Sequence, residues 1–317
     1  MILAILRGAD AGKEGFGLIK KRPSEHVFDV ANYTFMILFS AACIYPFVIV
    51  LALSLNEGKD AMMGGIYLFP RVFTLENYGT MLGDRRLVGS LVISVYRTVV
   101  GAGLAVLLNS MFAYAISKRT LPGRKFFGYF ILVPMYFSGG LIPYYLVCQY
   151  LGLINNVLVY VVPWIFLPFY ILMLRVHFLN IPESLEESAK LDGAGYITIF
   201  FRILLPLSTP ALATVALLSG VMHWNDWFDG TVMVSTDRLW PLQTLLLKIV
   251  QGSDIMAYFK SRNLNATGAI GPSRTVSVTP EALKMSMLMI SVIPIVAIYP
   301  FLQKYIIKGL LIGSIKG

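Results

Sequence analysis

The sequence predicts an all-α membrane protein whose chain crosses the bilayer six times. Of its 317 residues, 57% are hydrophobic and only 14% are charged, and the mean hydropathy is +0.72. Soluble domains carry about 25% charged residues, so this chain has too few charges to cover a water-facing surface of its size. Six apolar runs are each long enough to cross about 30 Å of hydrocarbon. These observations disfavour a soluble α/β domain.

The six apolar runs consist mainly of Leu, Ile, Val, Phe, Ala and Met over about 18 residues or more, as a membrane helix requires. They predict an N-terminal tail over residues 1–29, a membrane domain over 30–310 and a C-terminal tail over 311–317. The expected spans are Val30–Leu55, Val88–Ile116, Phe126–Val147, Val157–Leu179, Leu207–Trp224 and Met285–Leu310.

Basic residues predict the orientation of these spans. Lys20, Lys21 and Arg22 precede the first span, and cytoplasmic flanks carry an excess of Lys and Arg. The second-to-third connection is also basic, whereas the third-to-fourth connection, residues 148–156, has no charge. We therefore expect both termini in the cytoplasm, a cytoplasmic loop at 180–206 and an external loop at 225–284. The net charge of +9 then reflects membrane flanks, and we expect no nucleic-acid partner.

Prolines and glycines interrupt three of the expected spans, which allows two interpretations. In transporters such breaks mark moving or substrate-facing helices, because non-helical backbone at membrane depth needs protein or a water-lined cavity around it. A single proline is otherwise an ordinary kink that neighbouring helices accommodate. The densest group lies in the third span, and the residues are Pro134, Gly139, Gly140, Pro143, Pro163, Pro168, Pro294 and Pro300.

The loop between the fourth and fifth spans predicts a short amphipathic helix. Its start has Pro182 and acidic residues, which suit the positive end of a helix dipole. We expect Glu186 to pair with Lys190 at i,i+4, and Leu185 to lie one turn from Ala189. Gly193 and Gly195 are expected to end the helix.

The same loop resembles the coupling motif of bacterial ATP-binding-cassette (ABC) importer permeases. That motif reads Glu-Ala-Ala, three residues, Gly, nine residues, Ile, one residue, Leu-Pro. Here Glu187, Ser188 and Ala189 open it, Gly193 and Ile203 follow at the same spacing, and Leu205-Pro206 closes it. Ser188 replaces the first Ala, and both side chains are small.

This resemblance implies the type I ABC importer permease fold, with a cytoplasmic coupling helix that docks on a separate ATPase. The implied ATPase contacts are Glu186, Glu187, Ser188, Ala189, Asp192 and Gly193. The chain has no G-x-x-x-x-G-K-[ST] phosphate loop. We therefore expect a non-catalytic subunit that binds no cofactor, with ATP and Mg²⁺ used by the ATPase.

The resemblance extends over nearly the whole chain and is strongest to permeases of carbohydrate uptake, in particular those for aldouronates and polysaccharide fragments. It rests on Ser138–Pro143, His223–Phe228 and Phe301–Gly317. It implies a bacterial cell-membrane location among lipid and an oligosaccharide substrate. The implied partners are a second homologous permease, two ATPase subunits and an extracellular solute-binding protein.

Several polar and aromatic residues are candidates for the substrate path. Arg97 lies inside the second span, where a charge is a functional candidate; it either lines a cavity for an acidic sugar or pairs with the second permease. Aromatic rings stack on sugars, but they also form belts at the membrane interface. The candidates are Arg97, Tyr136, Tyr144, Tyr145, Trp224 and Asn225. The acidic residues after Trp224 match no metal-ligand spacing, so we expect no metal site.

Two other classes of membrane protein are alternatives. An ion-coupled secondary transporter would need charged pathways at mid-depth, and the sequence offers only Arg97 there. An integral-membrane enzyme would need paired catalytic groups at one cavity, and we find no such arrangement. Neither class explains the motif at Glu187–Pro206.

Overall fold

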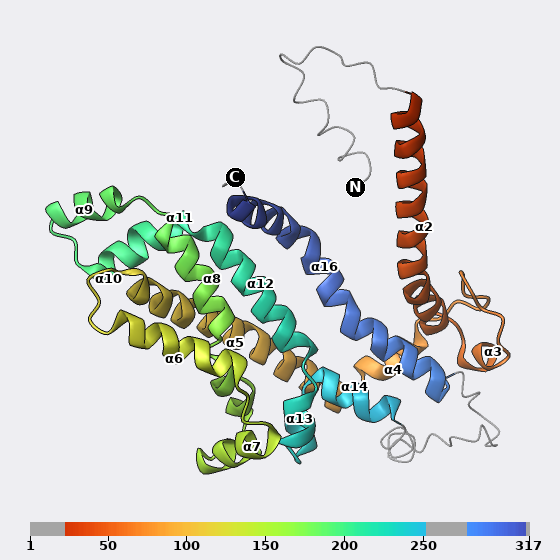
Figure 1. Ribbon diagram of the computed structural model, residues 1–317. Coiled ribbons are helices and arrows are strands. Elements are labelled where there is room, and N and C mark those ends of the chain that lie inside the picture. The colour runs from red at the N-terminus through yellow and green to blue at the C-terminus, as the bar shows by residue number, and fades with distance from the viewer. Residues whose placement is uncertain (1–22, 252–277, 315–317) are drawn as a thin grey trace. The chain divides into compact units, whose positions relative to one another are not determined.

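The computed structural model describes residues 23–251 and 278–314, with the side chains of residues 25–251, 278–300 and 303. These residues form helices and connecting turns, with a single isolated bridge between Asn56 and Phe73 and no longer strand. The all-α prediction is therefore confirmed for the described part of the chain (Figure 1). The expected tails at 1–29 and 311–317 lie largely outside it, although helix already begins at Pro23 and continues to Ser314.

The first expected span is helix α2, Pro23–Ser54, which begins seven residues before the predicted Val30. Its side chains are apolar on all sides, as a lipid-surrounded helix requires, and Phe28, Phe35 and Phe39 are among the exposed ones. Within the described part of the chain, the residues up to Ile49 and those from Val50 onward belong to two separate units.

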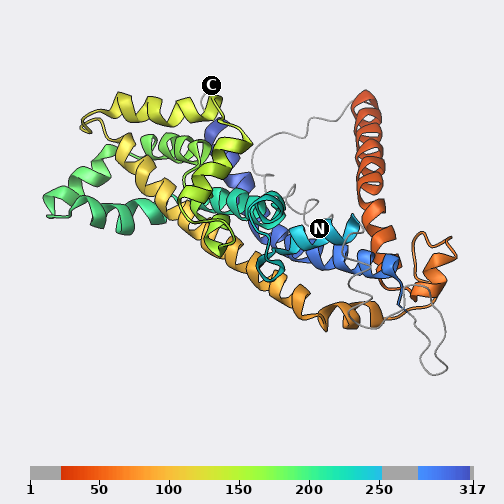
Figure 2. The same cartoon turned by 90° about the horizontal axis from the view of Figure 1, so that it is seen from below.

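The second span is α5, Arg85–Ser117, which follows the short helices α3 (Gly58–Met62) and α4 (Glu76–Leu82). Asp84 caps its start by accepting a hydrogen bond from the Arg86 N–H at 2.9 Å. In both views α5 lies beside α8 and α12 (Figures 1 and 2), and it packs against both helices.

The third expected span is two helices, α6 (Arg124–Tyr136) and α7 (Leu141–Tyr150). They have 13 and 10 residues, so neither alone reaches the roughly 20 needed to cross a bilayer. The break falls at the predicted Gly-Gly pair, where Gly140 adopts a φ of +80°.

The fourth expected span is also bent. It consists of η1 (Val157–Tyr160), η2 (Val162–Trp164) and α8 (Pro168–Leu179), with 45° between the two parts. Buried Asn109 of α5 satisfies the broken backbone: its Nδ2 donates to the Ile165 carbonyl at 2.6 Å, and its Oδ1 accepts from the Leu167 N–H at 3.0 Å. Such side-chain replacement is what allows a break at membrane depth.

The chain then forms α9 (Glu183–Leu191), α10 (Tyr196–Ile199), a π-helical turn η3 (Phe200–Leu204), α11 (Leu205–Leu207) and α12 (Thr209–Asn225). The direction changes by 82° between Tyr196–Leu207 and Thr209–Val232. Among the described residues three helices are long and apolar enough to span a membrane, and the two bent pairs raise this number to five. The expected number of six stays a prediction.

After α12 come α13 (Phe228–Val232), η4 (Asp237–Leu239), α14 (Leu242–Val250) and α16 (Pro280–Ser314). Helix α16 starts as a capped helix, because the Ala282 N–H donates to Thr279 Oγ1 at 3.4 Å. One buried cluster joins α5, α8, α9 and α12, and a second joins α5, α12, α14 and α16. Helices α5 and α12 therefore lie at the centre of the second unit.

Candidate functional site

Helix α9 is closed at its end by a Schellman motif, as the glycines in the loop predict. Gly193 has a φ of +83°. Its N–H donates to the Lys190 carbonyl at 3.0 Å, and the Ala194 N–H donates to the Ala189 carbonyl at 2.9 Å. This pair of bonds requires a residue in the left-handed region, which glycine adopts without strain. The motif fixes the angle at which the chain leaves α9.

One face of α9 is bound to the chain's own α5. The Glu186 carboxylate forms an ion pair with Lys118 and lies 3.5 Å from the Tyr114 hydroxyl. The Lys118 ammonium also lies 4.4 Å from the centre of the Tyr114 ring. Ala189 is buried beside this contact, in the cluster that contains Tyr114.

These contacts bear on two expectations. Glu186 and Ala189, which the resemblance implies at the ATPase contact, pack against this chain's own α5, and their contact with an ATPase stays a prediction. The expected pair between Glu186 and Lys190 does not form, because Lys118 is the cation of Glu186 and the Lys190 ammonium lies 5.0 Å from the ring centre of Tyr196. Leu185 and Ala189 lie one turn apart in α9 as expected, with Ala189 buried and Leu185 at the exposed edge of the same side.

The rest of the surface of α9 is exposed and partly apolar. It carries the predicted residues Glu187, Ser188, Asp192 and Gly193. Leu191 is 89% exposed and Ile197, in α10, is 74% exposed. Sequence reasoning missed both. Leu191 was detectable, because at 100° per residue it lies about 200° around the helix from Ala189. We call Leu185, Glu187, Ser188, Leu191, Asp192, Gly193, Tyr196 and Ile197 the exposed coupling face.

The last part of the motif forms the bend that leads into α12. The Ser208 N–H donates to the Leu204 carbonyl at 2.9 Å, and Thr209 Oγ1 donates to the Pro206 carbonyl at 2.7 Å. Proline has no N–H to continue the helical hydrogen bonds, and a π-helical turn is a common irregularity at functional positions. The motif's closing residues thus set the change of direction between α11 and α12.

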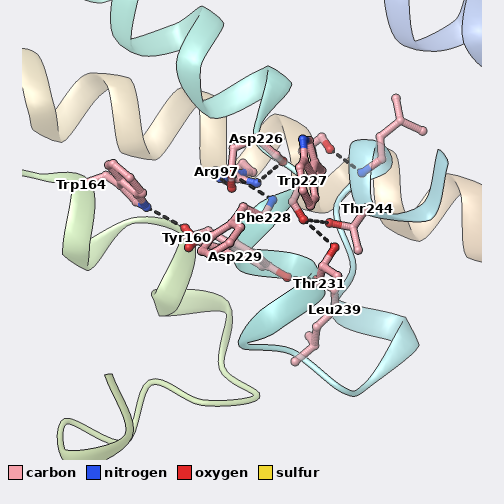
Figure 3. A network of polar contacts seen from close by, with 12 residues as sticks. Arg97, Tyr160, Trp164, Asp226, Trp227, Phe228, Asp229, Thr231, Leu239 and Thr244 are labelled. Atoms are coloured by element: carbon pink, nitrogen blue, oxygen red, sulfur yellow. Dashed lines mark hydrogen bonds and ion pairs between the residues drawn. The ribbon is translucent and has the colours of Figure 1, made fainter. Parts of the chain in front are cut away.

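A second polar site lies around the C-terminal end of α12 (Figure 3). Arg97 of α5 is 1% exposed. Its Nη2 donates to Asp226 Oδ2 at 2.6 Å and its Nη1 to the Asp226 carbonyl at 2.9 Å. The guanidinium carbon also lies 4.8 Å from the ring centre of Tyr160. The charge of Arg97 is therefore neutralised within its own chain.

Asp229 continues this site. Its carboxylate is fully buried and accepts hydrogen bonds from the Tyr144 hydroxyl at 3.0 Å and from Trp164 Nε1 at 2.6 Å. The Tyr160 hydroxyl donates to the Leu239 carbonyl at 2.8 Å. We call Arg97, Tyr144, Tyr160, Trp164, Asp226 and Asp229 the polar cluster. It joins α5, α7, η1, η2 and α13, which are distant in sequence.

The structure brings only two of the six substrate-path candidates together, Arg97 and Tyr144. Trp224 is buried, and its Nε1 donates to the Ser291 carbonyl of α16 at 3.0 Å. It is thus a packing residue in this conformation, and neither an interface ring nor an open stacking surface. The other three candidates have no contact with Arg97 or Asp229 among the described hydrogen bonds and ion pairs: Tyr136 is exposed at the end of α6, Tyr145 packs with Tyr144 in the cluster around Cys148, and Asn225 is exposed.

His223 is a buried residue that the polar cluster does not use. It is 1% exposed, and neither ring nitrogen has a hydrogen-bond partner among the described residues. The ring packs against Gly101 of α5, where a Cβ would lie 2.5 Å from Nε2. The absence of a side chain at position 101 is what lets α12 approach α5 here.

Comparison with known proteins gives one consistent result. The model of the family described as "Binding-protein-dependent transport system inner membrane component" matches residues 15–312. The polygalacturonan/rhamnogalacturonan transport system permease protein YtcP of Bacillus subtilis (strain 168) is 36% identical over 291 residues, which are 92% of this chain and 99% of that protein.

Two further relatives agree in length and fold. Protein LplC of the same organism is 36% identical over 292 residues, covering 92% of this chain and 95% of LplC. A crystal structure of a bacterial ABC transporter involved in the import of the acidic polysaccharide alginate contains a chain with a TM-score of 0.82 and 29% sequence identity. The match covers 90% of this chain and 98% of that one.

Proposed function

The chain belongs to the family of inner-membrane components of binding-protein-dependent transport systems, and we propose that it forms half of the path through which an ABC importer takes up oligosaccharides derived from polysaccharides. It is a permease component of such an importer, and its family has a transport role rather than a catalytic one. An acidic oligosaccharide is supported by the names of two similar proteins, which refer to polygalacturonan/rhamnogalacturonan and to alginate. Arg97 does not add to that support, because Asp226 already neutralises it.

An ABC importer permease works with a partner permease, an ATPase and a binding protein. For this chain we propose one homologous permease, two ATPase subunits and an extracellular solute-binding protein. ATP and Mg²⁺ are used by the ATPases, and this chain binds no cofactor. The proposed orientation places both termini and α9 on the cytoplasmic side of the cell membrane.

The observation that carries the coupling role is the division of α9 into two faces. One face is tied to α5 through Glu186, and the other exposes Leu191 and Ile197 beside acidic residues. An exposed apolar group with a polar rim indicates a protein interface. We propose that the exposed coupling face docks on the ATPase, and that Glu186 transmits its displacement to α5.

The first experiment identifies the partners. The tagged chain is purified in mild detergent from its own host, and co-purifying proteins are identified by mass spectrometry. Recovery of a second permease and of an ATPase supports the proposal. Recovery of the chain alone, in a form that transports without ATP, would establish a secondary transporter instead.

The second experiment tests the exposed coupling face in the reconstituted importer. Leu191→Asp and Glu187→Gln should reduce both uptake and the ATPase stimulation caused by the substrate-loaded binding protein. Asp237→Asn is the matched control, because Asp237 is an exposed acidic residue outside α9. Normal uptake by both α9 variants would remove the coupling role from this face.

A further inference from the structure

The loop between α2 and α4 carries a dense group of exposed apolar side chains. Met63 and Phe69 are each 81% exposed, and the other members of the group are between 56% and 69% exposed. Soluble proteins seldom expose contiguous apolar patches of this kind without a partner. We call the group the loop apolar surface, and it consists of Met62, Met63, Tyr67, Leu68, Phe69 and Phe73.

This loop is built directly onto the last turn of α2. The Glu57 N–H donates to the Val72 carbonyl at 2.9 Å, and the Thr74 N–H donates to the Leu55 carbonyl at 2.8 Å. Asn77 of α4 closes the same junction, because its buried Nδ2 donates to the carbonyls of both Ser54 and Asn56. The loop is therefore fixed within a few residues of the point where the apolar helix ends.

The polar groups of the loop are used internally. Arg71 forms an ion pair with Asp60 at 3.1 Å and donates to the Gly64 carbonyl at 2.8 Å. Asp60 also accepts from Asn56 Nδ2 at 2.9 Å. Ile66 is buried and anchors the loop from within. Arg71 and Asp60 therefore bond to groups of the loop itself, and Ile66 is its buried anchor, while the remaining apolar side chains are exposed.

The depth of the membrane at this junction follows from the length of α2. Its apolar run from Val30 to Leu55 is about 39 Å long at 1.5 Å per residue. The hydrocarbon layer is about 30 Å thick, and about 40–45 Å with the headgroups. Even with some tilt, the end of this run lies at the boundary between hydrocarbon and water, and the loop begins there.

We propose that the loop apolar surface inserts into the interfacial layer of the lipid bilayer and anchors the end of α2. Aromatic side chains are enriched at this depth, because their rings favour the boundary between acyl chains and headgroups. A protein occupant, such as the solute-binding protein, is the competing explanation. The bilayer is favoured because the hydrogen bonds hold this surface at the end of an apolar span, where lipid is present in every state of the importer.

Spin labelling of the complete importer in lipid nanodiscs tests this proposal. Exposed Cys43 is replaced by Ser, and labels are placed at Met63→Cys and Phe69→Cys. Two collision rates are measured for each label, one with oxygen, which concentrates in the bilayer, and one with a water-soluble nickel chelate. The result is the ratio of the first rate to the second. We expect this ratio to be several-fold higher than at the control Asp237→Cys, and unchanged when the binding protein is added.

A ratio equal to that of the Asp237 control would overturn the proposal. Labels that are water-exposed alone but immobilised by the binding protein would assign the surface to protein docking. If the labelled variants assemble poorly, Phe69→Trp provides a second measurement. Brominated phospholipids should quench its fluorescence beyond the quenching of the four native tryptophans in the parent chain, and no additional quenching would equally exclude insertion.

Discussion

Removal of the Arg97 guanidinium should destabilise the protein rather than change its substrate. Arg97→Met deletes two charge-assisted hydrogen bonds, of 2.6 and 2.9 Å, and the contact with the Tyr160 ring. It leaves the Asp226 carboxylate without a cation. Breaking a buried pair in this way costs about 3–5 kcal/mol. The Asp226 side chain is 19% exposed, so water recovers part of the loss and we expect about 3 kcal/mol.

Thermal unfolding of the purified importer measures this loss. A destabilisation of this size corresponds to a decrease in Tm of roughly 6–12 °C. The double variant Arg97→Met/Asp226→Leu should recover much of the loss, because it removes the unpaired charge as well. Arg238→Met is the control, since Arg238 is exposed in η4, and its Tm should match that of the parent.

One result would refute this reasoning. If Arg97→Met unfolds at the same temperature as Arg238→Met, yet uptake of acidic oligosaccharides is lost while neutral ones still enter, Arg97 contacts the substrate. In that case the ion pair with Asp226 would not contribute to stability. Arg97 would then line the path of an acidic sugar, which is one of the two roles expected from the sequence.

Three further predictions concern other contacts. Gly101→Ala should cost about 1–3 kcal/mol in stability through overpacking, because its Cβ would meet His223. Gly103→Ala, with nothing within 4 Å, should not lower Tm, since alanine is the better helix former. Glu186→Gln should keep the ATPase bound in pull-down assays but reduce uptake per ATP hydrolysed, whereas loss of ATPase binding would contradict the inward role. The hydrogen bond from Asn56, together with Arg71, lowers the pKa of Asp60 below its usual 3.8. The Tm of the parent protein should therefore exceed that of Asp60→Asn above pH 3.8, and this difference should shrink as the pH falls below 3.8.

The local elements of this chain were predictable because their signals are local. The end of α9 at Gly193 follows from residues within one turn of that boundary, whereas α16 begins at Pro280, five residues before the expected Met285. The break at Gly139-Gly140 was predictable for the same reason. The structure confirms these two, since each depends on backbone preferences that neighbouring helices need not supply.

The buried faces were not predictable in this way. The sequence suggested Lys190 as the partner of Glu186, because it lies one turn away, whereas the actual cation is Lys118, 68 residues earlier. The expected i,i+4 pair is worth only a few tenths of a kcal/mol. The ion pair of the buried Glu186 carboxylate with Lys118 of the neighbouring helix outweighs this small contribution. Similarly, nothing local shows that Asn109 completes the backbone at Ile165 and Leu167.

Arg97 was the case in which the sequence left two roles open and the structure supplied a third. A cation within a span needs a counter-charge at the same depth, and Asp226 at the end of the fifth expected span was available as that acid. The missing information was that α5 and α12 are neighbours, 129 residues apart at this contact. Once α5 and α12 are known to be neighbours, the ion pair between Arg97 and Asp226 follows from electrostatics alone.

The two ion pairs together indicate how α9 is connected to the rest of the membrane domain. Lys118 and Arg97 lie 21 positions apart along α5 and its C-cap, which is about 32 Å of helix and close to the thickness of the hydrocarbon layer. At its C-cap α5 binds α9 through Lys118 and Glu186, and in its first half it binds the end of α12 through Arg97 and Asp226. Helix α12 is itself joined to α9 by the chain through Ser208. A partner that displaced α9 would therefore have to move α5 and α12 with it or break the partly buried Lys118–Glu186 ion pair.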